Sequence, residues 1–191
     1  MNIENEKTIL DIDKKEFVAK LLIAGAKEVC PERKQIRCVY DIDPNNKNKW
    51  MRLRTNGEKT TLTIKEISNN SKVGAKEIEI EVSDFEETNK ILEELGYHAR
   101  NRQENLRHIF EIDGAEVSID TWPMIPPYAE IEAEDLSQIE NVLNTLDVDR
   151  NKTTKLDVVS IYNEIYGIDV MAITDLRLED KNGESMLECN K

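Results

Sequence analysis

The chain has 191 residues and a formal net charge of −13 at pH 7, from 39 acidic and 26 basic side chains. Its length suits one globular domain, and no run approaches the ~18 apolar residues that a membrane span requires. So large an acidic excess argues against nucleic acid as a general partner, because phosphate backbones are bound by basic surfaces. An anionic ligand would need a local cationic site or a bridging metal.

The cysteines and the first residues indicate a cellular compartment. Cys30, Cys38 and Cys189 are odd in number and lack metal-ligand spacing. Residues 1–10 have neither the basic start nor the apolar stretch of a signal peptide. We therefore expect reduced thiols in a cytoplasmic protein without membrane attachment.

Three amphipathic helices are predicted, and each follows an acidic alternating segment. Their ranges, with the residue expected to cap each, are 14–24 (Asp13), 84–95 (Ser83) and 136–146 (Asp135). Glu16 stands three residues after Asp13, the spacing of a capping box. Gly25 and Gly96 are suited to end the first two helices, and a fourth helix is expected to end at Gly167.

Alternating polar and apolar residues predict strands between these helices. The patterns occupy 3–13, 34–42, 51–65, 76–82, 105–112, 115–122 and 128–134. Asn56-Gly57 divides 51–65 into a hairpin, and Asp113-Gly114 joins another pair. The count approaches eight strands without regular βαβα alternation, which indicates an α+β fold built on an antiparallel sheet or β-barrel, with helices packed outside. We expect one domain over 1–173 and a polar C-terminal tail over 174–191.

The charged residues of these strands are sorted by sign. Cations on one face of the 51–65 hairpin are Arg52, Arg54 and Lys65. Acids that share strand faces are Glu4 with Glu6, Glu77 with Glu79 and Glu81, and Glu130 with Glu132. A solvated sheet surface is the plain alternative, but ordinary surfaces mix the two signs. With helices covering the apolar faces, the ionic faces would line a cavity that binds phosphate and Mg²⁺ or Mn²⁺.

The order of these motifs resembles the CYTH superfamily, the triphosphate tunnel metalloenzymes. The motifs are Glu4-x-Glu6, "RLR…LTIK", "EIEIEV", "LRHIF", "IDTWP" and "EIEAE", and the resemblance runs from Asn2 to about Tyr166. The family includes class IV adenylate cyclases, thiamine triphosphatases and inorganic triphosphatases, and "IDTWP" and "YNEIYGI" are similar to the cyclase-like branch. The resemblance implies an eight-stranded antiparallel tunnel that is charged within and binds a triphosphate.

The resemblance also implies roles for single residues. Positions that match phosphate ligands are Arg52, Arg54, Lys65 and Arg107, of which Lys65 and Arg107 are assigned to catalysis. Weaker substrate-binding candidates are Arg100, Arg102 and Lys155. Positions that match the metal ligands and tunnel acids are Glu4, Glu6, Glu130, Glu132, Asp120, Glu79 and Glu81. The expected cofactor is Mg²⁺ or Mn²⁺.

One position departs from the family's opening motif, Glu-x-Glu-x-Lys. Thr8 stands where the lysine should be. Lys7 is adjacent, but on a regular strand it would point away from the tunnel, and only a bulge would bring it in. Losing one cation should weaken triphosphate binding or transition-state stabilisation without necessarily abolishing either.

The sequence therefore predicts a metal-dependent enzyme that acts on ATP, thiamine triphosphate or tripolyphosphate. It does not separate a cyclase, in which the 3′-hydroxyl attacks the α-phosphorus, from a triphosphatase, in which water attacks the terminal phosphorus. Tyr40 and Trp50 could border a base or thiazole, although packing is their plainer role. The alternatives are a non-catalytic nucleotide- or polyphosphate-binding module, which Thr8 favours, and a scaffold that binds nothing. Homodimer formation is left open.

Overall fold

The structure is a computed structural model that describes residues 5–43, 45–46, 48–66 and 76–178. The longer strands are β1 (Asn5–Ile9), β2 (Lys27–Asp41), β3 (Lys49–Thr55), β4 (Thr60–Glu66), β5 (Lys76–Val82), β6 (Ala99–Ile112), β7 (Ala115–Thr121) and β8 (Tyr128–Ala133). Two short strands are β9 (Thr153–Thr154) and β10 (Asp175–Leu176). The helices are α1 (Lys14–Ile23), α2 (Phe85–Glu94), α3 (Leu136–Thr145) and the short α4 (Val158–Ser160).

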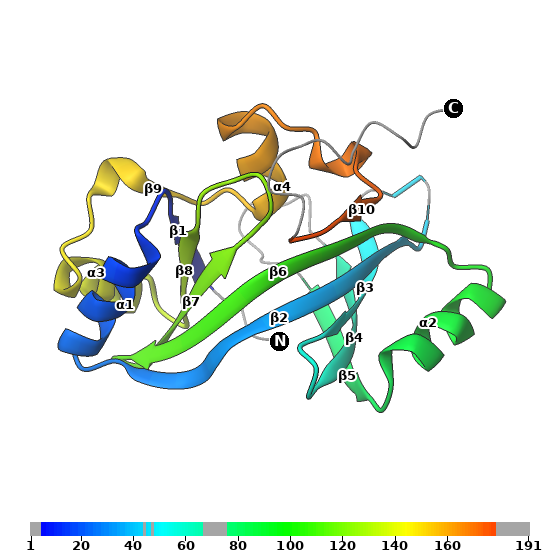
Figure 1. Cartoon of the computed structure of the whole chain (residues 1–191), viewed down its shortest axis with the longest axis horizontal. Coiled ribbons are helices and arrows are strands. Elements are labelled where there is room, and N and C mark those ends of the chain that lie inside the picture. Colours follow the sequence, from blue (N-terminus) through cyan, green and yellow to red (C-terminus); the bar gives the residue numbers. More distant parts are fainter. Residues whose placement is uncertain (1–4, 44, 47, 67–75, 179–191) are drawn as a thin grey trace.

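The strands form one sheet in the order β5-β4-β3-β2-β6-β7-β8-β1-β9, and β10 pairs in parallel with β6. The long strands β2 and β6 run side by side across the molecule and join its two halves (Figure 1). Within the described residues, the terminal strands β5 and β9 do not hydrogen-bond to each other, so the sheet is not closed by a ladder. The predicted α+β fold, with eight antiparallel strands and helices outside, is confirmed and is consistent with a tunnel; β9 and β10 are additional.

The helices cover the apolar face of the sheet at two places. Helices α1 and α3 lie at one end of the molecule and α2 at the other (Figure 1). The first core contains Phe17, Leu21, Val117, Ile119, Ile131, Val142 and Leu143. The second contains Cys38, Tyr40, Met51, Leu53 and Leu92. Because strand side chains alternate, burying these residues turns the ionic residues between them toward the opposite face.

The helix ends in the structure mostly agree with those predicted from the sequence. The Asp13 carboxylate accepts a hydrogen bond from the Glu16 N–H at 2.9 Å, so α1 begins as predicted. Helix α2 begins one residue later than predicted, because Asp84 rather than Ser83 caps it and accepts from the Glu87 N–H at 2.8 Å. Both residue types cap helices well, and an aspartate adds a negative charge at the positive end of the helix.

The C-terminal segment packs over the end of β7. The fourth predicted helix is divided into α4 and a π-helical turn at Ile161–Ile165. The apolar cluster there contains Trp122, Ile125, Tyr128, Ile161, Tyr162, Val170 and Leu176. Ordered structure therefore reaches into the segment 174–178 that the sequence assigned to a tail, while 179–191 lie outside the described residues. The division into 1–173 and 174–191 stays a prediction.

None of the helices in the described part of the chain has the length and apolar character needed to cross a bilayer.

Candidate active site

The strand register gathers the ionic residues on one side of the sheet, which we call the charged face. Its central members are Arg37, Arg52, Arg54, Arg107, Asp120 and Glu130. Arg37 on β2 lies opposite Arg54 on β3, and Arg107 on β6 lies opposite Asp120 on β7. The predicted gathering of arginines and carboxylates on one face is therefore present in the structure.

Arg52 and Arg54 have few protein partners for their charges. Arg52 Nη2 lies 3.8 Å from Glu79 Oε2, and Arg52 Nε is buried without a hydrogen-bond partner within the described residues. Arg54 forms no hydrogen bond or ion pair with any residue that the structure describes. Guanidinium donors left unsatisfied in a buried place are costly unless a ligand or water satisfies them.

The surroundings of these arginines disfavour their positive charges. Burial lowers the pKa of Arg52 to about 9, and the charges of Arg54 and Arg37 act in the same direction. Burial also lowers the pKa of Arg54, and the charge of Arg107 contributes. Cations held together against desolvation and mutual repulsion make a site at which an anion binds favourably.

Arg107 has the opposite environment, because two carboxylates surround it. Its Nη2 donates to Asp120 Oδ2 at 2.7 Å and to Glu130 Oε2 at 2.8 Å. Asp120 is fully buried and also accepts a hydrogen bond from Asn105 Nδ2 at 2.7 Å. Burial alone would lower the pKa of Arg107, but the charges of Asp120 and Glu130 outweigh it and raise that pKa. Arg107 is thus part of a buried ion-pair network.

A second group of carboxylates lies beyond Glu130, on β8 and β1. Glu6 is directly opposite Glu132, which in turn is opposite Glu116 on β7. Burial raises the pKa of Glu130, and although Arg107 opposes this, Asp120 and Glu6 reinforce it. Like charges that face each other across strands are unfavourable unless a cation offsets them. Glu116 was not among the residues predicted from the sequence. Its alternation with Ser118 and Asp120 on the same strand could have placed it on the charged face.

These donors fit a hard divalent cation in chemical type. Carboxylate oxygens are the preferred ligands of Mg²⁺ and Mn²⁺. Within the described ranges, no three His, Cys, Asp or Glu side chains are gathered closely enough to hold a metal ion. Glu4, which the resemblance places with Glu6, lies outside the described residues. The metal roles of Glu4, Glu6, Glu130, Glu132 and Asp120 stay predictions.

The position of Thr8 follows the regular strand pairing predicted for it. Strand β1 pairs with β8 without a shift over Asn5–Ile9, which places Thr8 opposite Glu130 on the charged face. Lys7 points the other way, and its Nζ lies 3.2 Å from Glu140 Oε1 on α3. No bulge brings Lys7 to the charged face, so Thr8 stands at the position of the family's lysine.

Strands β4 and β5 pair their opposite charges across the sheet. Lys65 forms an ion pair with Glu77, and Lys59 lies 3.3 Å from Glu81. Thr63 Oγ1 donates to Glu79 Oε2 at 2.6 Å. Burial raises the pKa of Glu79, but the Thr63 hydrogen bond and the arginines at 52 and 54 outweigh it and lower that pKa. Glu79 therefore belongs with the cations of the charged face, while Glu81 is largely exposed.

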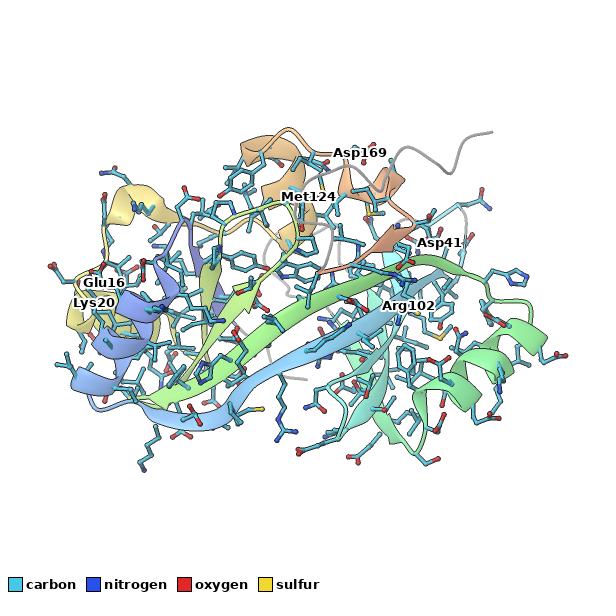
Figure 2. All side chains as sticks on the ribbon, viewed as in Figure 1. Glu16, Lys20, Asp41, Arg102, Met124 and Asp169 are labelled. Atoms are coloured by element: carbon cyan, nitrogen blue, oxygen red, sulfur yellow. The ribbon has the colours of Figure 1, made fainter. Side chains whose placement is uncertain are left out.

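Two of the three weaker candidates, Arg100 and Arg102, lie away from this group. Arg102 is an odd number of residues from Arg107 on β6, so it faces the other side of the sheet, where it contacts Glu104 at 3.2 Å. Figure 2 shows Arg102 far along the long strands from Glu16 and Lys20 of α1. Arg100 forms an ion pair with Asp41, and Lys155 is exposed. Lys155 directly follows Thr154, which lies opposite Thr8. The substrate-binding roles of these three residues stay predictions.

Among the six central members of the charged face, Arg37 is the one that sequence reasoning missed. It lies on β2 between Gln103 of β6 and Arg54 of β3. Burial lowers the pKa of Arg37 to about 10. The sequence showed that Arg37 lies in an alternating segment, residues 34–42. It did not show which strands flank β2, and therefore which residues Arg37 would face. Tyr40, considered as a ligand-bordering aromatic, is buried in the core under α2, and its hydroxyl hydrogen-bonds to Asn89.

Comparison with known proteins identifies the family. The CYTH domain model matches residues 7–164. This match spans most of the chain, so the protein belongs to the CYTH domain family. No curated protein gives a significant sequence match.

Solved structures share the fold at low sequence identity. A conserved hypothetical protein from Pyrococcus furiosus has a TM-score of 0.69 and 20% identity, with 81% of this chain and 97% of that chain covered. A candidate adenylate cyclase from Vibrio parahaemolyticus has a TM-score of 0.67 and 13% identity, with coverage of 87% and 98%. HpAC1 from Hippeastrum, a candidate adenylyl cyclase with a dominant triphosphatase activity, has a TM-score of 0.57 and 12% identity, with coverage of 86% and 96%. At these identities the likeness shows the fold alone.

Proposed function

We propose that the protein is a divalent-metal-dependent enzyme that acts on a triphosphate, and that hydrolysis of the phosphate chain is its main reaction. The observation that carries this proposal is the pair Arg52 and Arg54, whose buried charges have few carboxylate partners. A linear polyanion would offset their repulsion and accept hydrogen bonds from their free donors. Membership of the CYTH family agrees with such a substrate.

Each charged residue has a part in this proposal. Arg52 and Arg54 would bind phosphate oxygens through their planar guanidinium groups. The charge of Arg107 acts on Arg54, and Arg107 would stabilise charge that develops on the reacting phosphate, while Asp120 holds it in place. Lys65 would supply a further charge from β4, at the cost of weakening its ion pair with Glu77. Phosphoryl transfer depends mainly on such positioning and charge neutralisation.

The acidic strands would hold the metal. Glu6, Glu130 and Glu132, with Glu4, are the residues that would bind Mg²⁺ or Mn²⁺. A bound divalent cation would neutralise phosphate oxygens that the arginines do not reach.

Cyclisation of ATP is the second candidate reaction. It is favoured by the fold likeness to the Vibrio parahaemolyticus candidate cyclase, whereas the triphosphatase activity of HpAC1 favours hydrolysis. We place hydrolysis first because the cations of the charged face would contact phosphate groups rather than a nucleobase or ribose. Tyr40, one of two aromatic residues considered for a nucleobase, is packed beneath α2.

A non-catalytic polyphosphate-binding module is the alternative from a different class. Its support is Thr8, which places a neutral side chain opposite Glu130 where the family's lysine is expected. This alternative keeps the cationic site and predicts triphosphate binding without turnover. Cytoplasmic location, the absence of a nucleic-acid partner and the homodimer stay predictions.

Turnover measurements distinguish these functions. The purified protein is given ATP, thiamine triphosphate or tripolyphosphate with Mg²⁺ or Mn²⁺, and orthophosphate, pyrophosphate and cyclic AMP are quantified. A Glu4→Gln/Glu6→Gln variant is the blank. We expect orthophosphate from at least one substrate. Cyclic AMP with pyrophosphate from ATP would instead establish the cyclase, and saturable binding without any product would establish the binding module.

A further inference from the structure

Arg37 lies at the centre of the charged face in an arrangement that leaves its outer nitrogens free. Its Nε donates to Gln103 Oε1 at 2.7 Å. Within the described residues, neither Nη1 nor Nη2 donates a hydrogen bond, and no carboxylate lies within 4.0 Å. A guanidinium has five N–H donors, so four of them are available to a ligand.

An aromatic side chain holds the plane of this guanidinium. Arg37 Cζ lies 4.3 Å from the ring centroid of Trp122, in the geometry of a cation–π contact. Trp122 is 4% exposed and is fixed in turn by an edge-on contact with Tyr162. The Trp122 Nε1–H is also buried without a partner in the described part of the chain. Arg37 is therefore held in place while the donors on its Nη atoms have no acceptor among the described residues, which is typical of a preorganised anion contact.

Arg37 and Thr8 flank the same ion-pair network. Arg37 lies on β2, next to β6, from which Arg107 reaches Asp120 and Glu130. Thr8 lies on β1, directly opposite Glu130, on the other side of that network. A cation at either position would add positive charge close to the same buried acids.

We propose that Arg37 binds a phosphate group of the substrate through its Nη atoms and supplies the positive charge that Thr8 does not. The inference rests on the proposed function, because it names a further contact to the same triphosphate. Its position explains why an arginine is tolerated directly opposite Arg54: a phosphate between them would bridge two like charges.

The first test measures affinity rather than activity. Tripolyphosphate is titrated by calorimetry into the wild-type protein, Arg37→Gln and Arg37→Lys. Since a hydrogen bond to a charged group is worth about 1.5–3 kcal/mol, Arg37→Gln should weaken binding about 10- to 100-fold. Arg37→Lys should lie between, because lysine keeps the charge but loses the planar fork and the stacking. The matched control is Arg150→Gln, an arginine paired with Glu140 outside the charged face, which should bind as the wild type does.

Tryptophan emission gives a readout specific to this position. In a Trp50→Phe background the remaining tryptophan is Trp122, whose ring touches the Arg37 guanidinium. Tripolyphosphate should change its emission, and Arg37→Gln should abolish that change at concentrations that still saturate the site. An unchanged response in Arg37→Gln would overturn the contact.

A rescue variant tests the relation to Thr8. Thr8→Lys in the Arg37→Gln background should recover at least tenfold of the lost affinity, with thermal unfolding confirming that each variant is folded. Wild-type affinity in Arg37→Gln would overturn the phosphate-binding role. Weakened affinity that a folded Thr8→Lys variant does not restore would overturn the replacement of the lysine. Failure of the wild-type protein to bind tripolyphosphate would refute the proposed function itself.

Discussion

The arginines in the two halves of the charged face differ in how many carboxylate partners they have. On β7 and β8, Asp120 and Glu130 surround Arg107, which forms hydrogen bonds to both. On β3, Arg54 has no hydrogen bond or ion pair among the described residues, and Arg52 is 3.8 Å from its nearest carboxylate oxygen. The first arrangement is an ion-pair network in which the loss of one charge would leave the others buried without a partner. The second is a set of buried charges without close carboxylate partners among the described residues, so we infer that the proposed ligand binds at Arg52 and Arg54.

The largest expected effect is the loss of Arg107. Arg107→Gln would leave the fully buried Asp120 without its charged partner, and breaking such a pair costs about 3–5 kcal/mol of unfolding free energy. Urea denaturation measures this change. The double variant Arg107→Gln/Asp120→Asn should recover part of the loss, because it removes both charges. A loss below ~1 kcal/mol would contradict the structural role assigned to this half of the site.

The ligand should stabilise the protein by nearly as much. Tripolyphosphate at about 100 times its dissociation constant should raise the unfolding free energy by about 2.7 kcal/mol. The stabilisation should decrease as salt screens the exposed part of the site. Denaturation with and without ligand checks this. An unchanged unfolding curve would favour a scaffold whose charged faces bind nothing.

Replacing Arg54 should separate binding from stability. We expect Arg54→Gln to weaken tripolyphosphate affinity about 10- to 100-fold, because it removes a charge-assisted hydrogen bond. The unfolding free energy of the free protein should stay the same or rise, since the change removes a buried charge that lacks an ion-pair partner among the described residues. Calorimetry and urea denaturation measure the two quantities. A destabilisation comparable to that of Arg107→Gln would mean that both halves are structural.

The smallest effect is expected at Lys7, which points away from the charged face. Its partner Glu140 is 52% exposed, and surface ion pairs contribute about 0–1 kcal/mol. Lys7→Ala should therefore change the unfolding free energy by less than ~1 kcal/mol and leave triphosphate turnover as it was. A marked loss of turnover would show that β1 pairs in a shifted register that brings Lys7 to the substrate.

The face of each strand residue could be predicted from the sequence, because alternation is a local property. Arg52 and Arg54 share a face with each other and with Thr63 of the paired strand, as the alternation required. The same rule could have excluded Arg102, which is five residues from Arg107 on one strand and therefore faces the opposite way. The cap of α1 at Asp13 and the hairpin at Asn56-Gly57, where Gly57 has φ +88°, are local in the same sense.

The sequence by itself thus determined the alternating strands, the apolar faces of the helices and the family motifs in their order. The tertiary structure decided which strands are neighbours, and with that the composition of the site. Arg37 belongs to the charged face because β2 lies between β3 and β6, a pairing between residues far apart in the chain. The tertiary structure also places two carboxylates beside Arg107, whereas Arg54 has no ion-pair partner among the described residues. The balance of charges at a buried site depends on contacts between distant strands, and local patterns do not specify those contacts.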